Sequence, residues 1–174
     1  MQLAFFGDIV GRPGRNAAAD ALRTFVKEQG VTAALANVEN ASGGLGLTVR
    51  TAAEIKGMGF LGLSSGNHIW KHREIYSYLE EQPFLVRPAN YPEGAPGRGM
   101  AVLEPEGGAP IVLLNLIGRT YMEPVDCPFA KADLLLAQLD TGLKHIIVDF
   151  HAEATSEKLA MLHHLDGRVS AVLG

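Results

Sequence analysis

The fold class follows from a strand pattern at residues 111–117, which read IVLLNLI. A segment that is apolar on both faces is typical of a buried strand in a parallel sheet. Similar runs lie at 2–6, 31–38, 60–64, 145–150 and 169–173, with a weaker run at 100–103 that we expect to be an edge strand. Helical patterns lie between them, at 14–28, 50–58, 72–82, 130–140 and 156–165. Strands that alternate with helices predict an α/β fold in which helices cover both faces of a mostly parallel sheet.

Length and composition favour one globular domain, 1–174, because 47% of the 174 residues are hydrophobic and 20% are charged. The net charge is −4 and Lys and Arg form no run, so we expect no long nucleic-acid groove. The single cysteine, Cys127, forms no internal disulfide, as is typical of a reducing compartment. No signal peptide precedes Gly7, and no apolar stretch is long enough to span a bilayer. We therefore predict a cytoplasmic protein with no membrane partner.

Polar side chains follow four of the predicted strands. They are Asp8 after the first strand, Glu39 and Asn40 after the second, Asn67 and His68 after the third, and His151 after the strand at 145–150. The carboxyl ends of parallel strands share one edge of a sheet, which is where ligands bind in open α/β sheets. We therefore expect these six side chains to converge on one crevice.

The residue types in this set suit transition-metal ions. Carboxylate and amide oxygens favour manganese or iron(II), and imidazole adds a preference for transition metals. Glu39 is the natural bridge, because one carboxylate can hold two cations. Two cations about 3.5–4 Å apart would clamp a phosphoryl group and hold a hydroxide for in-line attack. Such chemistry requires no serine or cysteine nucleophile.

Each residue also has a structural explanation when it is taken alone. Gly7-Asp8 is compatible with a turn or a helix cap, Asn67-His68 with a helix cap, and His151 with a core histidine. The joint pattern at four strand ends favours a functional site. Asp149 and Glu153 flank His151, and either is a candidate acceptor for an imidazole N–H, with a helix-start carboxylate as the equal alternative for Glu153.

Five segments together resemble one protein family. They are Gly7-Asp8-Ile9-Val10-Gly11, Glu39-Asn40, Gly66-Asn67-His68, Arg87-Pro88-Ala89-Asn90-Tyr91-Pro92 and the ten residues 149–158, DFHAEATSEK. Over its whole length the chain resembles the YmdB-like branch of the bacterial calcineurin-like metallophosphoesterases. The resemblance implies a four-layer α/β sandwich with mostly parallel buried strands and helices on its faces. It also implies two divalent or mixed-valence metals, iron or manganese, and phosphodiesterase activity on 2′,3′-cyclic nucleotides.

The resemblance further implies a role for each residue of the set. The two implied metal sites are Asp8, Glu39 and Asn40 for one ion, and Glu39, Asn67 and His151 for the other. His68 would be the general acid that protonates the leaving oxygen. The wider superfamily has Asp-x-His where this chain has Val10 in the histidine position, and the YmdB-like branch shares that difference.

The same resemblance bears on the end of the chain. In the YmdB-like branch, the strand matching 169–173 is followed by Gly-Thr-His-Thr-His, which supplies one histidine to each metal. The present sequence ends at Gly174, the first residue of that segment. We therefore expect the 174 residues to be a metallophosphoesterase domain that is incomplete at its C-terminus.

Two other functions stay open. A non-catalytic regulator that binds a nucleotide or RNA through the crevice has no need of an acid beside the metals, so His68 favours an enzyme. A phosphomonoesterase of the same superfamily would share the two-metal core, since substrate choice depends on loops such as 42–48 and 86–99. The charge favours a small phosphodiester or nucleotide as substrate. The oligomeric state is also open, with a homo-oligomer among the alternatives.

Overall fold

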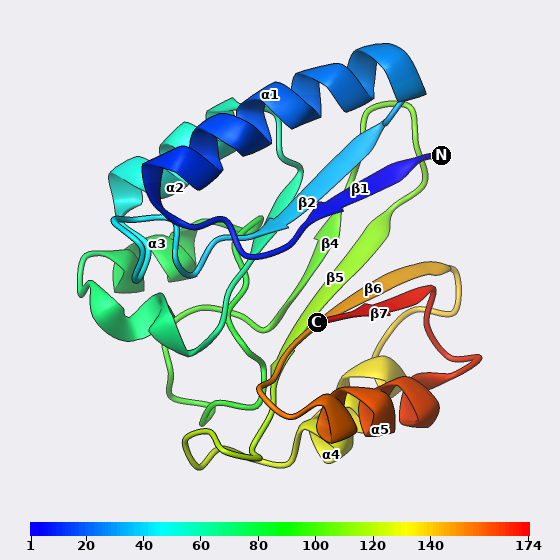
Figure 1. Cartoon of the computed structure of the whole chain (residues 1–174). Coiled ribbons are helices and arrows are strands. Elements are labelled where there is room, and N and C mark those ends of the chain that lie inside the picture. The colour runs from blue at the N-terminus through cyan, green and yellow to red at the C-terminus, as the bar shows by residue number, and fades with distance from the viewer.

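The computed structural model describes residues 1–174 and has four stacked layers (Figure 1). The strands are β1 (Leu3–Phe6), β2 (Ala33–Asn37), β3 (Gly62–Ser64), β4 (Met100–Leu103), β5 (Ile111–Ile117), β6 (His145–His151) and β7 (Ala171–Leu173). The helices are α1 (Gly11–Gln29), α2 (Val49–Gly57), α3 (Ile75–Glu81), α4 (Pro128–Ala137) and α5 (Thr155–Leu165), with a short 3₁₀ helix, η1 (Asn67–Lys71). Helices α1, α2 and α3 cover one sheet, and α4 and α5 cover the other.

The strands form two sheets, in the orders β1-β2-β3 and β4-β5-β6-β7. All neighbours are parallel except β4, which runs antiparallel to β5 at the edge of the second sheet. The predictions of mostly parallel strands and of an edge strand at 100–103 are thus confirmed. The expectation of one sheet covered by helices on both faces is wrong.

The alternation along β5 explains why one sheet was expected. Ile111 and Leu113 pack in the cluster between the two sheets, whereas Val112, Leu114 and Leu116 pack against α4 and α5. A strand between a sheet and a helix layer is apolar on both faces, just as a strand between two helix layers is. The sequence pattern therefore does not separate the two arrangements. The four layers implied by the family resemblance are confirmed.

The Pro- and Gly-rich segment 86–99 forms neither helix nor strand, as expected, and a buried cation holds it in place. Arg87 is only 5% exposed, and burial lowers the pKa of its guanidinium. The guanidinium donates to four carbonyl oxygens, those of Pro88, Ala95, Pro96 and Gly97, at 2.8–3.3 Å. Because these bonds tie the loop to itself, the loop keeps a defined shape beside the carboxyl ends of the strands.

None of the helices combines the length and the apolar character that a membrane span requires.

Candidate active site

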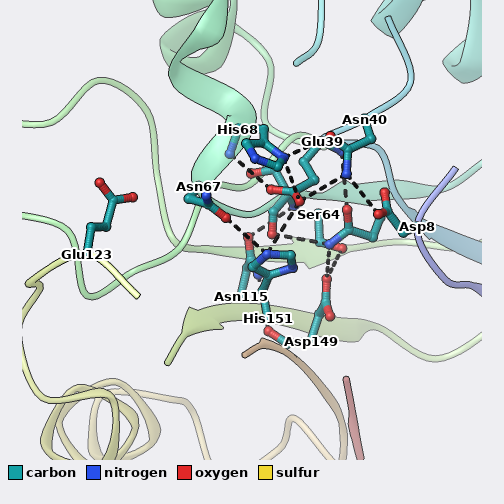
Figure 2. Close-up of polar contacts among 12 residues, drawn as sticks. Asp8, Glu39, Asn40, Ser64, Asn67, His68, Asn115, Glu123, Asp149 and His151 are labelled. Carbon is teal, nitrogen blue, oxygen red and sulfur yellow. Dashed lines mark hydrogen bonds and ion pairs between the residues drawn. The ribbon is translucent and has the colours of Figure 1, made fainter. Parts of the chain in front are cut away.

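The six predicted side chains converge beyond the carboxyl ends of β1, β2, β3 and β6 (Figure 2). Glu39 lies at the centre and is 1% exposed. Its Oε1 atom lies 3.3 Å from His68 Nδ1 and 3.3 Å from His151 Nε2. A single buried carboxylate oxygen thus faces two imidazoles that come from different sheets.

Two asparagines complete the cluster. Asn67 Oδ1 lies 3.1 Å from Nε2 of His151. Asn40 donates from Nδ2 to Asp8 Oδ2 at 2.8 Å and to Glu39 Oε1 at 3.2 Å. The oxygen of the Asn40 amide therefore faces away from Asp8. It lies 2.8 Å from Nδ1 of the His68 ring.

The first residues of η1, which follows β3, contact the Glu39 carboxylate. The backbone N–H of His68 donates to Glu39 Oε2 at 3.1 Å, because the first amides of a helix have no partner within it. Gly66, just before η1, lies so close that a Cβ on it would be 2.2 Å from Glu39 Oε2 and 2.6 Å from His151 Cδ2. Only glycine permits this approach of backbone to side chains.

A second group of polar residues lies beneath the cluster and joins the two sheets. Asp149 is 3% exposed and accepts hydrogen bonds from Asn37 Nδ2 at 2.9 Å and from the Ser64 hydroxyl. Asn37 Oδ1 in turn accepts from the backbone N–H of Glu39 at 3.2 Å. Burial raises the pKa of the Asp149 carboxyl. Asp149 thus positions Asn37, which positions the backbone of Glu39.

Asn115 adds to this group from β5. Its Oδ1 accepts from the Ser65 N–H at 3.1 Å, and its Nδ2 donates to the backbone oxygen of Asp149 at 3.1 Å. Asn115 is not among the residues that the sequence pattern predicts to be functional. The sequence does mark Asn115 as the one polar residue in the apolar strand IVLLNLI. Because a buried amide needs hydrogen-bond partners, such a residue is a candidate for a structural role near the site.

The prediction that Asp149 or Glu153 accepts an imidazole N–H is wrong. The Asp149 carboxylate accepts hydrogen bonds from Asn37 and Ser64, whereas His151 Nε2 faces Asn67 and Glu39. Residues two apart in a strand, such as Asp149 and His151, lie on the same face of the sheet. Asp149 lies deeper between the two sheets than His151, so its carboxylate bonds to Asn37 and Ser64 and not to the His151 ring.

The chemistry of the cluster fits transition-metal ions, although no three His, Cys, Asp or Glu side chains form a ready-made metal-holding group. The buried carboxylate of Glu39 has no Lys or Arg within ion-pair distance, and its two charged or chargeable neighbours are imidazoles. A buried carboxylate is stabilised by hydrogen bonds, by a cation or by both, and a bound metal ion would supply the cation here. Carboxylate, amide oxygen and imidazole together are donors that manganese and iron accept.

A cavity of about 390 Å³ adjoins the cluster. Its lining includes Asp8, Asn37, Asp149, His151 and Lys158. A second cavity, of about 320 Å³, lies at the opposite edge of the first sheet, between α1 and the start of β2. No carboxylate, imidazole or thiol lines the second cavity, so the chemistry is concentrated at the first.

Comparisons with known proteins identify a family and similar structures. The model of the family described as "YmdB-like protein" matches residues 4–174. A 2′,3′-cyclic-nucleotide 2′-phosphodiesterase of Bacillus subtilis is 41% identical over all 174 residues, which span 66% of that relative. A crystal structure of a hypothetical protein from Thermus thermophilus has a TM-score of 0.92 at 41% identity, over 100% of this chain and 67% of that one. A novel phosphatase from Mycoplasma pneumoniae has a TM-score of 0.87 at 31% identity, over 96% of this chain and 60% of that one.

The chain thus spans about two thirds of the length of the curated relative it matches. The family match covers nearly all of its residues, and the fold and the clustered motifs agree with it. This protein therefore belongs to the YmdB-like family.

Proposed function

We propose that the chain carries the catalytic centre of a metal-dependent phosphodiesterase that hydrolyses 2′,3′-cyclic nucleotides. The observation that supports this most is the buried Glu39 carboxylate, which faces the imidazoles of His68 and His151 at 3.3 Å. The name of the relative from Bacillus subtilis supports the same reaction and substrate class.

The residues that would hold two ions of iron or manganese are Asp8, Glu39 and Asn40 for one, and Glu39, Asn67 and His151 for the other. When bound, such ions supply Lewis acidity and a nucleophile at neutral pH. Asn40 would serve the first ion only if its amide turns over, because its oxygen faces His68. Glu39 would serve both, since its two oxygens lie at the centre of the set.

His68 is the proposed general acid. Its Nδ1 lies 2.8 Å from Asn40 Oδ1 and 3.3 Å from Glu39 Oε1. The Glu39 carboxylate is an acceptor whichever way the Asn40 amide is turned, so it places a proton on Nδ1. With Nδ1 held as a donor, the ring acts as an acid through Nε2 when that nitrogen also carries a proton, which passes to the leaving oxygen and leaves a neutral ring. The side chain is 39% exposed, so a substrate can reach it.

The substrate is a small diester in this proposal. The net charge of −4 and the lack of a run of Lys and Arg do not suit a long polyanion. A phosphomonoesterase is the second candidate, because the similar structure from Mycoplasma pneumoniae is described as a phosphatase.

A substrate panel separates the two candidates. Full-length protein loaded with manganese would be assayed on 2′,3′-cyclic AMP, on bis(nitrophenyl) phosphate and on 3′-AMP. The proposal predicts turnover of both diesters and little release of phosphate from 3′-AMP. Efficient hydrolysis of the monoester, with neither diester turned over, would replace the phosphodiesterase with the phosphatase.

A further inference from the structure

The short helix η1, which carries His68, depends on its side chains for its position. It has five residues, and 3₁₀ turns have poorer hydrogen-bond geometry than α-helical turns. A helix this short is not stable by itself, so packing must hold it. Ile69 is fully buried in the core between the first sheet and its helices and provides one anchor. Trp70, two residues after His68, provides the second anchor.

Two tyrosine rings hold the indole ring of Trp70. It packs edge to face with Tyr76, at a centroid distance of 5.7 Å, and with Tyr91, at 5.1 Å. The buried indole N–H has no hydrogen-bond partner in the protein, so packing and not hydrogen bonding fixes the ring. Tyr76 lies on α3, which follows η1 directly, whereas Tyr91 belongs to the loop 86–99. The Tyr91 contact therefore joins η1 to a distant part of the chain.

The packing of the cores does not account for Tyr91. The residue is only 8% exposed, yet it is in none of the three hydrophobic core clusters. Its hydroxyl donates to the Glu123 carboxylate, which fixes the orientation of the ring. Figure 2 shows Glu123 on the side of the cluster where Asn67 lies, away from Asp8. The Tyr91 ring thus bridges a loop and η1 beside the catalytic cluster.

The preceding residue fastens this loop to the second sheet. Asn90 is fully buried, and its Nδ2 donates to the backbone oxygens of Ile117 at 2.8 Å and of Asp126 at 2.9 Å. Its Oδ1 accepts from the N–H of Ile117 at 2.9 Å. Ile117 pairs with His151 at the ends of β5 and β6. The loop that carries Tyr91 is therefore fixed to the strand end that supplies His151.

His68 and His151 come from different sheets, so their separation depends on contacts that join the sheets at this edge. We propose, on the basis of the function proposed above, that Tyr91 is a positioning residue that holds His68, through Trp70, where it can protonate the leaving oxygen. A general acid must lie within hydrogen-bond reach of the atom it protonates. A displacement of about 1 Å at such a site lowers the rate roughly 100-fold.

The dependence of turnover on the leaving group separates this role from a general effect on folding. Full-length wild type, Tyr91→Leu and Tyr91→Phe, loaded with manganese, would be assayed on 2′,3′-cyclic AMP and on bis(nitrophenyl) phosphate, whose leaving group needs no acid. Loss of the ring should lower kcat about 10- to 100-fold on cyclic AMP and much less on the nitrophenyl ester, with KM and metal content unchanged. Phenylalanine keeps the ring and should retain kcat within a factor of a few.

Two further variants control the assay. Tyr78→Leu removes a ring from another edge-to-face pair, with Phe84 at 6.3 Å, which includes no residue of η1, and it should leave kcat on both esters near the wild-type value. Trp70→Leu removes the other ring of the proposed contact, should lower kcat on cyclic AMP selectively, and replaces Tyr91→Leu if that variant does not fold. The double variant should lose no more than Trp70→Leu alone, because both changes act through one contact.

Crystal structures of full-length wild type, Tyr91→Leu and Tyr91→Phe give a readout that does not depend on turnover. Tyr91→Leu should move the His68 ring by about 1 Å relative to Glu39, whereas Tyr91→Phe should leave it in place. An unmoved His68 ring in Tyr91→Leu, or an equal loss of kcat on both esters, would overturn the positioning role. A displaced His68 in a protein that turns over no diester would keep the positioning role and overturn the proposed reaction.

Discussion

Replacing Gly66 by alanine would test the geometry of the catalytic cluster with a single methyl group. Gly66 has φ −147° and ψ −150°, an extended conformation open to any residue, so the substitution adds no backbone strain. The new Cβ would lie 2.2 Å from Glu39 Oε2 and 2.6 Å from His151 Cδ2. Ordinary contact begins near 3.4 Å, so the carboxylate must retreat by about 1 Å, the difference between 3.4 and 2.2 Å.

The consequences for stability and for activity should differ in size. Overpacking of this kind costs about 1–3 kcal/mol of unfolding free energy. A displacement of about 1 Å at a catalytic constellation lowers turnover roughly 100-fold. The assay is turnover of 2′,3′-cyclic AMP beside a thermal unfolding curve for the same sample. Gly66→Ala should therefore remain folded at room temperature and yet be nearly inactive.

Gly7→Ala is the matched control. Gly7 lies beside Asp8 at the same edge of the sheet, but a Cβ on it would meet no atom within 4 Å. This variant should keep turnover within a factor of a few of the wild type. Wild-type turnover in Gly66→Ala would show that the positions of Glu39 and His151 in the structure are not those of the working site.

Three further substitutions test other parts of the reasoning. His68→Ala should lose about 10²–10⁴-fold in turnover, and the loss should shrink for nitrophenyl esters, which need no acid; an equal loss for all esters would exclude the acid role. Asp149→Leu removes one of the two acceptors of the buried Asn37 amide, the other being the Ser65 backbone oxygen, and should cost about 1–3 kcal/mol in chemical denaturation, whereas an unchanged midpoint would show that the pair contributes nothing. The hydrogen bond from Arg168 lowers the pKa of Asp133 below its ordinary 3.8, so the pair stabilises the fold above that pH and ceases to do so as pH falls through the lowered pKa. The Tm gap between wild type and Asp133→Asn should accordingly be present at pH 7 and close in acid, and a gap independent of pH would refute the pairing.

The sequence predicted elements and strand ends well, for a physical reason. Buried parallel strands are marked by continuous apolar runs, and six of the seven strands here were found as such runs, with the antiparallel strand at 100–103 identified as weaker. Polar residues that directly follow those runs must lie at one edge, which is why Asp8, Glu39 and His151 were found together. Only the backbone topology was required for that inference.

The features that were missed depend on contacts between distant residues. The 3₁₀ helix at Asn67–Lys71 arises where the chain turns to bring its amides to Glu39, and no local pattern predicts it. Asn115 looks like an exception in an apolar strand until its partner Ser65 is known. That residues 1–174 form a single domain stays a prediction.

The metal content of wild type and of Glu39→Gln tests the central proposal most directly. Full-length protein would be purified, incubated with manganese, separated from free ions, and analysed by elemental analysis, with Glu28→Gln on the exposed surface of α1 as an isosteric control. A bridging Glu39 predicts about two ions per chain in the wild type and in the control, and loss of both in Glu39→Gln, because the charge between the ions is removed. Undiminished metal in Glu39→Gln would show that Glu39 does not hold the ions and would contradict the proposed centre.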